Sequence, residues 1–358
     1  MKRTWSRLIV AAIALTLVTL VIGCAGSSYY VRSAKLHIGT KNYDEALKVL
    51  QEGSTVAPND ADPELWYTMG QLYFEKKQWA EMNEAFSKSL ELDPRFETDI
   101  KKTRYNAWQR LASSGVQAFQ QGDYAKAIES FQTALVVRPN NDETLANLGL
   151  CYLKQDDFEN AVESFKQSIQ YDDSEQKWVT KQNLLEVYRL MENYEAVVEL
   201  ATDIIANADT LTANRKITVI QSKAIALQRL GKTDEAVAAW DALIAADPTN
   251  ANFVFNKALL LDILERYDEA AVVYLKAIEL NPSDNEARMR AANALLGNQQ
   301  WETIKKVLEP WLFPDGVKVY EPEFTDLHTW MTLKAAYANL GEDASMKVVD
   351  EILKKISD

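Results

Sequence analysis

The sequence predicts an all-α solenoid, a stack of about eight to nine helix hairpins. Two related segments carry this prediction: GDYAKAIESFQTALVVRPNN, which begins at Gly122, and DDFENAVESFKQSIQYDDSE, which begins at Asp156. They correspond at an offset of 34 residues, so that Ala127 matches Ala161. The 358 residues contain only 12 glycines and 9 prolines, which argues against a turn-rich β-protein. A repeat of this length is typical of helical units that bury their apolar faces against neighbours.

The clearest single copy of the repeat has these residues: Trp66, Met69, Gly70, Tyr73, Phe86 and Pro94. Their spacing resembles the tetratricopeptide repeat, in which a first helix carries W-x2-L-G-x2-Y and a second carries A-x3-F. The resemblance implies an α-solenoid whose hairpins form a right-handed superhelix, and it covers nearly all of the chain after residue 24. Copies are expected to begin near Ser27, Pro63, Trp108, Asp142, Trp178, Ile217, Ala251, Asn285 and Leu327.

The residue types of the repeat have a physical reason. The glycines Gly70, Gly115 and Gly149 remove a side chain where the two helices of one hairpin approach each other. Large side chains fill the space between hairpins, and prolines end the second helices. The large side chains are Phe86, Phe131, Phe165, Trp240 and Tyr274, and the prolines are Pro94, Pro139, Pro248 and Pro282. The pattern departs from the family at Leu185, where glycine is usual, and at Pro310, where the eighth copy is expected to end early.

Two interruptions are expected within the array. Residues 97–107 lack glycine and carry Ile100 and Tyr105 in a helix-compatible run, which favours an overlong first helix over a flexible linker. Residues 309–324 contain three prolines and several aromatic residues, among them Trp311 and Tyr320, and predict a non-helical insertion. Its aromatic residues either pack on adjacent repeats or contact a partner.

The amino-terminal residues have the layout of an export signal. Basic residues precede an apolar stretch from Leu8 to Ile22, which at about 15 residues is short for a membrane-spanning helix. Val21 to Cys24 resembles the lipobox of bacterial lipoproteins, which implies that Cys24 is the lipid attachment site. Ala25, where inner-membrane lipoproteins tend to carry aspartate, resembles the outer-membrane default. An uncleaved signal anchor with an incidental cysteine is the alternative.

Together these features divide the chain into seven ranges. They are 1–23 (signal peptide), 24–28 (lipidated cysteine and short tether), 29–96 (copies 1–2), 97–107 (helical extension), 108–309 (copies 3–8), 310–326 (aromatic, proline-containing insertion) and 327–358 (C-terminal capping helix pair).

Composition and motifs exclude several kinds of chemistry. The formal net charge of −13 disfavours a nucleic-acid partner, because phosphate backbones repel an acidic surface. The sequence contains no phosphate-binding loop, nucleophile elbow or zinc-protease motif, so that enzyme activity, a cofactor and a metal are not expected. Cys151 is expected to be a small buried residue, since the chain has only two histidines.

The remaining candidate is the concave surface of the solenoid, which the first helices line in the family. The residues at those positions are Tyr67, Gln71, Phe74, Val116, Phe119, Leu150, Leu153, Gln182, Glu186, Arg189, Gln221 and Gln228. Their mixture of apolar and amide side chains predicts a protein or peptide segment as ligand. Chaperone-binding relatives hold a terminal carboxylate with lysine. The equivalent residues here are Tyr67, Ala112, Ala146, Gln182 and Gln221, so a carboxylate clamp is not expected.

Two functions follow from the resemblance. One is a lipid-anchored scaffold on the periplasmic face of the outer membrane, acting in the assembly of a pilus, a secretin or outer-membrane proteins. The other is an adaptor subunit for an envelope enzyme, such as a peptidoglycan hydrolase or a polysaccharide export machine. The sequence leaves both open.

Overall fold

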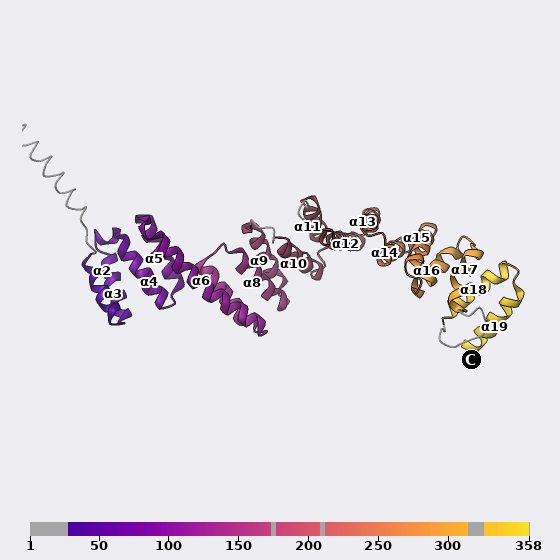
Figure 1. Cartoon of the computed structure of the whole chain (residues 1–358), viewed down its shortest axis with the longest axis horizontal. Helices are drawn as coiled ribbons and strands as arrows, with labels where there is room; N and C mark the ends of the chain where they lie inside the picture. Colours follow the sequence, from indigo (N-terminus) through magenta and orange to yellow (C-terminus); the bar gives the residue numbers. More distant parts are fainter. Residues whose placement is uncertain (1–27, 173–176, 208–211, 314–325, 358) are drawn as a thin grey trace, which may run out of the picture. The chain divides into compact units, whose positions relative to one another are not determined.

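The computed structural model describes residues 28–172, 177–207, 212–313 and 326–357. These residues form the helices α2 to α19, paired into nine successive hairpins with no strand in the described ranges (Figure 1). The prediction of an all-α solenoid of helix hairpins is therefore confirmed. The predicted signal peptide at residues 1–23, the predicted lipid attachment site Cys24, and Tyr320 of the predicted insertion lie outside the described residues.

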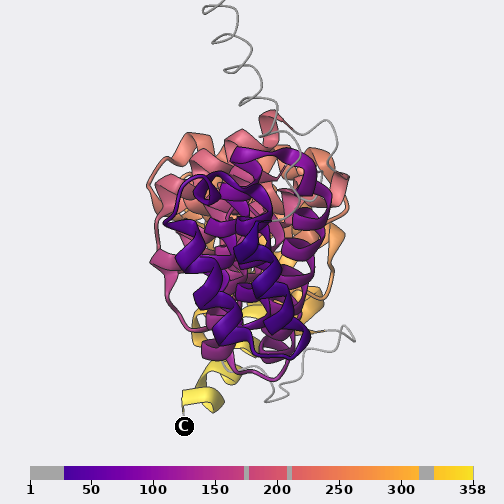
Figure 2. The same ribbon diagram turned by 90° about the vertical axis from the view of Figure 1, so that its left-hand side faces the viewer.

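The chain divides into two compact units, residues 1–180 and 181–358. Figure 2 looks at unit 1 from its first hairpins, drawn in indigo. Its helices are α2 (Tyr29–Gly39), α3 (Tyr43–Ser54), α4 (Pro63–Glu75), α5 (Trp79–Leu92), α6 (Glu97–Gln120), α7 (Tyr124–Val137), α8 (Asp142–Lys154) and α9 (Phe158–Tyr171). Two short 3-10 helices, Asn59–Ala61 and Pro94–Phe96, connect the first three hairpins.

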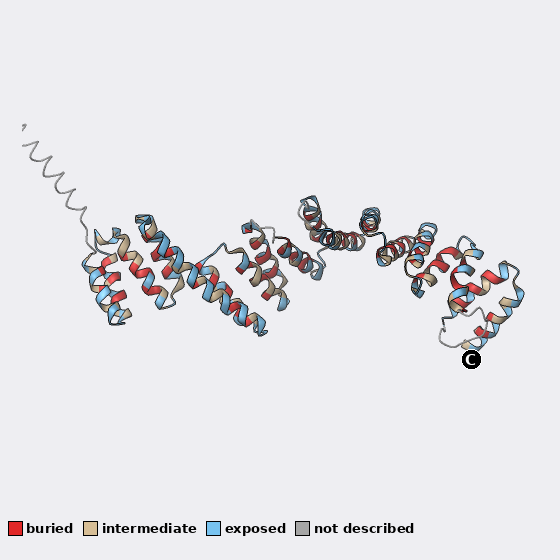
Figure 3. Ribbon diagram, viewed as in Figure 1, coloured by how far each residue is buried: buried red, intermediate tan, exposed pale blue. Residues whose placement is uncertain are grey.

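The division between the units falls within α10 (Lys177–Leu190). The remaining helices, all in unit 2, are α11 (Tyr194–Ala206), α12 (Ala213–Arg229), α13 (Thr233–Ala246), α14 (Ala251–Ile263), α15 (Tyr267–Leu280), α16 (Asn285–Leu296), α17 (Trp301–Leu312), α18 (Leu327–Asn339) and α19 (Asp343–Ser357). Within each unit the buried residues lie on the helix faces that meet one another, and the exposed residues lie on the outward faces (Figure 3).

One pair of buried residues recurs in every hairpin. A residue on the first helix is followed sixteen positions later by its counterpart on the second helix, as in Gly149 and Phe165. The pairs are Ala34/Leu50, Gly70/Phe86, Gly115/Phe131, Gly149/Phe165, Leu185/Ala201, Ala224/Trp240, Ala258/Tyr274, Ala292/Leu308 and Leu333/Val349. In most of them a small residue lies opposite a large one, which keeps the volume between the helices nearly constant.

The turn between the two helices of each hairpin is also the same throughout. The backbone N–H that follows the turn residue bonds to the carbonyl five residues earlier, as Gln78 N–H does to Tyr73 O at 2.9 Å. The turn residue itself has positive φ, and it is a glycine in only three hairpins: Gly122, Gly231 and Gly341. This Schellman geometry uses carbonyl groups that the helix end would otherwise leave without a partner.

The overlong helix expected before the third copy is present. Residues 97–107 form the first part of α6 and continue without a break into the rest of the helix. Helix α6 has 24 residues, whereas its partner α7 has 14. Arg104 holds this extension against α5, because its guanidinium donates to Asn83 Oδ1 at 2.9 Å and to Ser87 Oγ at 2.9 Å. The first helix of unit 1 is capped by Ser28, whose hydroxyl accepts from Val31 N–H at 3.3 Å.

Proline placement agrees with the sequence in four hairpins and differs in one. Helices α5, α7, α13 and α15 each end two residues before the proline that is expected to stop them. Pro310, however, lies inside α17, so the expected end of the eighth copy at Pro310 is wrong. Trp311 and Leu312 continue the helix because both pack against the C-terminal core of unit 2, and this burial offsets the hydrogen bond that proline cannot donate.

Candidate partner-binding surface

Two hollows lie on the first helices of unit 1. The first, which we call the α4 hollow, has a volume of about 390 Å³. It is lined by Ile38, Tyr43, Gln71, Leu72, Phe74, Glu75, Thr103 and Asn106. The second, the α6 hollow, has a volume of about 350 Å³ and lies between α6 and α8. It is lined by Tyr105, Trp108, Gln109, Ala112, Ser113, Val116, Gln117, Gln120, Glu143, Thr144 and Asn147.

The α6 hollow is built around Trp108. Its indole N–H donates to Thr144 Oγ1 at 2.8 Å, and the guanidinium of Arg138 lies 4.8 Å from the ring centroid. These two contacts, one from α8 and one from the end of α7, fix the orientation of the indole. Tyr105, one turn earlier, lies 5.5 Å from Trp108 between ring centroids and remains 48% exposed. The hollow therefore offers a fixed aromatic wall beside an accessible ring.

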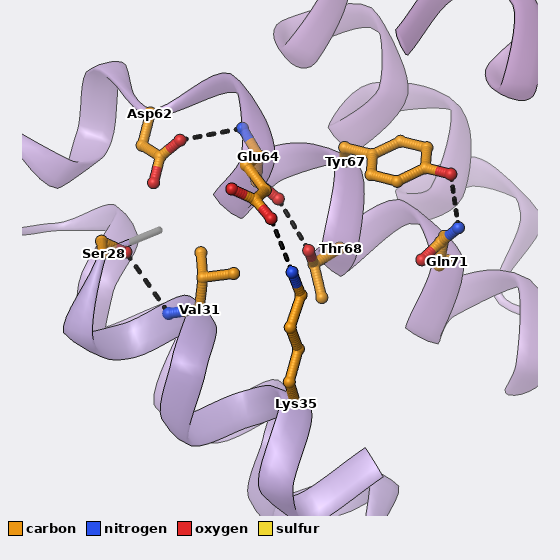
Figure 4. Close-up of polar contacts among 8 residues, drawn as sticks. All are labelled: Ser28, Val31, Lys35, Asp62, Glu64, Tyr67, Thr68 and Gln71. Carbon is orange, nitrogen blue, oxygen red and sulfur yellow. Dashed lines mark hydrogen bonds and ion pairs between the residues drawn. The ribbon is translucent and has the colours of Figure 1, made fainter. Parts of the chain in front are cut away.

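Contacts with neighbouring aromatic and polar side chains fix the residues around the α4 hollow. Phe74 packs edge-on against Trp79, with ring centroids 6.0 Å apart. Gln71 donates from Nε2 to the hydroxyl of Tyr67 at 2.6 Å (Figure 4). The same view shows Lys35 of α2 paired with Glu64 of α4 at 2.6 Å, a contact that ties the first two hairpins together. The hollow thus lies on a surface whose helices are joined by side-chain contacts.

Three of the residues expected in the groove line these hollows, namely Gln71, Phe74 and Val116. Tyr67 does not, because its ring stacks on Phe96 with centroids 4.2 Å apart and planes within 2° of parallel. Burial, with a smaller contribution from the charge of Asp99, raises the pKa of Tyr67. Tyr67 therefore supports the repeat itself and presents mainly its hydroxyl, through Gln71, to the groove.

Phe119, Leu150 and Leu153 also lie outside both hollows. Phe119 packs edge-on against Tyr124, with centroids 5.4 Å apart, and belongs to the apolar cluster around Phe131. Leu150 and Leu153 of α8 are half-buried. For Phe119, packing within unit 1 accounts for the apolar side chain.

The other predicted residues belong to unit 2 and are not brought into either hollow. Gln182, Glu186 and Arg189 lie on α10, and Gln221 and Gln228 lie on α12. Arg189 donates to both carboxylate oxygens of Glu186, at 2.5 and 2.7 Å, and this hydrogen bonding lowers the pKa of Glu186. The two charges satisfy each other within one helix.

Sequence reasoning missed Tyr105 and Trp108 as lining residues. The repeat register starts the third copy at Trp108, so Tyr105 lies before the first position that the register covers, and Trp108 marks the start of the copy rather than a groove position. The extension itself could have revealed Tyr105, because a first helix that begins earlier also lengthens the face that lines the hollow. Thr103 and Asn106 of the α4 hollow follow from the same extension.

The described residues contain no cluster of three or more histidine, cysteine or carboxylate side chains that could hold a metal ion. None of the described helices combines the length and the apolar character that a bilayer crossing requires. Cys151 is fully buried on α8, and burial raises the pKa of its thiol to about 11, which keeps it protonated at neutral pH.

The chain is built from helix hairpins in this register, and the first helices of unit 1 carry two hollows. This is the architecture of helical-repeat proteins, which present extended surfaces to other proteins. Sequence models of the tetratricopeptide repeat match residues 27–60, 63–96, 115–156, 142–175 and 222–285. These ranges cover more than half of the chain. The chain belongs to the tetratricopeptide repeat family.

No curated protein matches the chain at a significant level of sequence similarity. Among solved structures it is similar to MamA from Desulfovibrio magneticus RS-1, at 14% identity and a TM-score of 0.41, over 50% of this chain and 97% of that one. It is also similar to PilF from Pseudomonas aeruginosa, at 15% identity and a TM-score of 0.40, over 59% of this chain and 94% of that one. The TPR domain of P58(IPK) is 17% identical over 88% of each chain, with a TM-score of 0.29. At these scores the similarities carry no argument about function.

Proposed function

We propose that the chain is a lipid-anchored scaffold of a bacterial cell envelope, on the periplasmic face of the outer membrane, and that it acts by binding partner proteins. In this role it is not an enzyme, takes no cofactor and does not bind nucleic acid. The binding supplies contacts for the assembly of an envelope complex such as a pilus, a secretin or outer-membrane proteins.

The observation that carries the binding role is the pair of hollows on the first helices of unit 1. Each combines aromatic rings with uncharged amide side chains, as in Phe74 with Gln71 and Trp108 with Gln109. Rings give a peptide apolar anchors, and amides bond to its main chain without requiring a particular side chain. This chemistry suits an extended or helical protein segment.

The anchor rests on the sequence of residues 1–28, in which a basic start and an apolar stretch precede Cys24. Replacing Cys24 with serine should move the protein from the membrane to the soluble fraction of fractionated cells. Stable attachment needs more than one acyl chain, so a lipoprotein-type modification is the expected form. A Cys24→Ser protein that stays with the membranes after a high-salt wash would contradict the anchor and leave the binding role standing.

The binding role is tested by photo-crosslinking in intact cells. A photoreactive phenylalanine analogue at Gln71 or at Val116 should capture partner proteins, because both positions line a hollow. The same analogue at Glu84 or Glu129, which are exposed on the second helices α5 and α7, serves as the matched control. Capture only from the control positions would show that partners bind elsewhere. The identity of a captured protein separates the assembly role from that of an adaptor for an envelope enzyme.

A further inference from the structure

We infer that the segment bound by the two hollows is basic, with lysine or arginine side chains that pair with Glu75 in the α4 hollow and Glu143 in the α6 hollow. This inference rests on the proposed binding role of the first-helix face, and it adds the chemistry of the partner. It concerns unit 1 alone.

The charge of the lining residues carries the inference. Each hollow has a single charged lining residue, Glu75 in one and Glu143 in the other. Every other lining residue is apolar, aromatic, an amide or an alcohol, and none is a lysine, an arginine or a histidine. The carboxylate of each hollow would repel an acidic side chain of a ligand and attract a basic one.

Both carboxylates are available for a ligand. Glu75 and Glu143 are exposed, and within the described chain neither takes part in an ion pair or a side-chain hydrogen bond. Two basic residues near the hollows make contacts with other parts of unit 1. Lys76, the next residue after Glu75, pairs with Asp44, and Arg138 lies over the ring of Trp108. Neither Glu75 nor Glu143 is held in an ion pair by the described residues, so each carboxylate can pair with a basic side chain of a ligand.

The aromatic residues add to the fit. Lysine and arginine lay their aliphatic stems along apolar surface while the charged group reaches outward. Tyr105 is 48% exposed at the edge of the α6 hollow, and its ring face can receive such a stem or the cation itself. A carboxylate and an accessible ring in one hollow make a site that prefers a basic side chain to a neutral one.

The first experiment selects ligands from random sequences, so that the natural partner need not be identified beforehand. A display library of random 12-residue peptides is panned on the purified unlipidated protein, and in parallel on the Glu75→Gln/Glu143→Gln variant. The expected result is that peptides retained by the wild-type protein are enriched in lysine and arginine beside apolar residues. The variant should lose this enrichment.

The second experiment measures the size of the effect. The Kd of a selected basic peptide, measured by fluorescence anisotropy, should rise roughly threefold to thirtyfold in the Glu75→Gln/Glu143→Gln variant, as expected for losing two exposed ion pairs. The matched control is Glu84→Gln/Glu129→Gln, which makes the same change in net charge on the second helices and should leave the Kd unchanged. Added salt should weaken binding to the wild-type protein more than binding to the Glu75→Gln/Glu143→Gln variant.

The outcomes distinguish the proposed binding role from the inference that the ligand is basic. If peptides are retained, and binding is lost in a Phe74→Ala/Trp108→Ala variant that circular dichroism shows to be folded, the binding role holds. If those peptides then show no basic preference, or bind the glutamine variant equally well, the inference about charge is overturned. If no peptide is retained, or retention does not depend on Phe74 and Trp108, the binding role fails together with it.

Discussion

The ring of Phe165 lies directly over Gly149. A β-carbon added at residue 149 would be 2.7 Å from Cε1 of Phe165, closer than such contacts occur in folded proteins. The same relationship joins Gly115 to Phe131, where the distance to Cε1 would be 2.6 Å. The glycines of the repeat therefore make room for an aromatic ring from the second helix of their own hairpin.

Replacing Gly149 with leucine should destabilise the protein by roughly 1 to 3 kcal/mol, because the new side chain overpacks the site that the ring of Phe165 fills. Thermal unfolding followed by circular dichroism measures the effect. Gly39→Leu is the control, since a β-carbon at residue 39 would have no neighbour within 4 Å. An unchanged midpoint for Gly149→Leu would mean that the ring moves aside at little cost.

The fifth hairpin exchanges the sizes of this pair. Leu185 and Ala201 are both buried and stand at the positions that Gly149 and Phe165 hold in the preceding hairpin. We expect Ala201→Phe alone to destabilise by roughly 1 to 3 kcal/mol through overpacking, and Leu185→Gly alone to destabilise by about 2 to 5 kcal/mol through an empty space. Combined, they recreate the common pair and should cost less than the sum.

Chemical denaturation of the four proteins in this cycle gives the coupling energy between residues 185 and 201. A coupling of about 1 kcal/mol or more in the favourable direction supports the exchange of sizes. Additive losses would show that the two side chains do not share one space. Leu184→Gly with Ala201→Phe is a matched control, because Leu184 is also buried but stands one position out of register.

Arg104 joins the extension of α6 to α5. Its guanidinium donates to the side chain and the carbonyl of Asn83 as well as to Ser87, in the forked geometry that lysine cannot reproduce. Arg104→Ala should cost roughly 1 to 3 kcal/mol, because the partners on α5 lose a charge-assisted donor. Arg104→Lys should recover only part of this. Arg110→Ala, an exposed arginine on the same helix, should be nearly neutral in the same denaturation experiment.

The buried thiol of Cys151 should make the free energy of unfolding depend on pH in the alkaline range. Burial raises the pKa of its thiol to about 11, above the ordinary value of about 8.5, so the native state binds the proton more tightly than the unfolded chain. The stabilisation is fully present below about pH 8.5 and is lost as the pH rises toward 11. The advantage of the wild-type protein over Cys151→Ala should shrink across this range.

The same burial predicts slow alkylation. In a Cys24→Ser protein, where Cys151 is the remaining cysteine, iodoacetamide at about pH 8 should modify the native state far more slowly than the denatured state. Rapid modification of the native protein would show that α8 opens readily.

The repeat could be predicted from the sequence because its signals are local. Glycines, aromatic residues and prolines recur at fixed offsets, and the helices that they specify are present at those positions. The failure at Pro310 has a physical reason, since the apolar residues Trp311 and Leu312 pack against unit 2 and extend the helix past the proline. A rule that proline ends a helix takes no account of the burial of Trp311 and Leu312, which depends on residues of another hairpin.

The residues that line the two hollows were harder to predict from the sequence. Register places a residue on the first-helix face but does not show what already covers it. Tyr67 has the position of a ligand-binding residue, yet Phe96, which comes from the connecting 3-10 helix, stacks on its ring. Glu75 and Glu143 stand out only when the neighbours of each hollow are known, because nothing in their sequence context separates them from the many other carboxylates of an acidic chain.

The two members of each sixteen-residue pair belong to the same hairpin, and so does the positive-φ turn that joins its helices. Each hairpin thus contains both residues of its own packing pair. Neighbouring hairpins supply only the side chains that cover its outer faces. Such a unit can be copied, deleted or transplanted as a cassette without redesigning the rest. The number of cassettes, and with it the length of surface offered to partners, is open to change by gene duplication rather than by the slow adjustment of a single core.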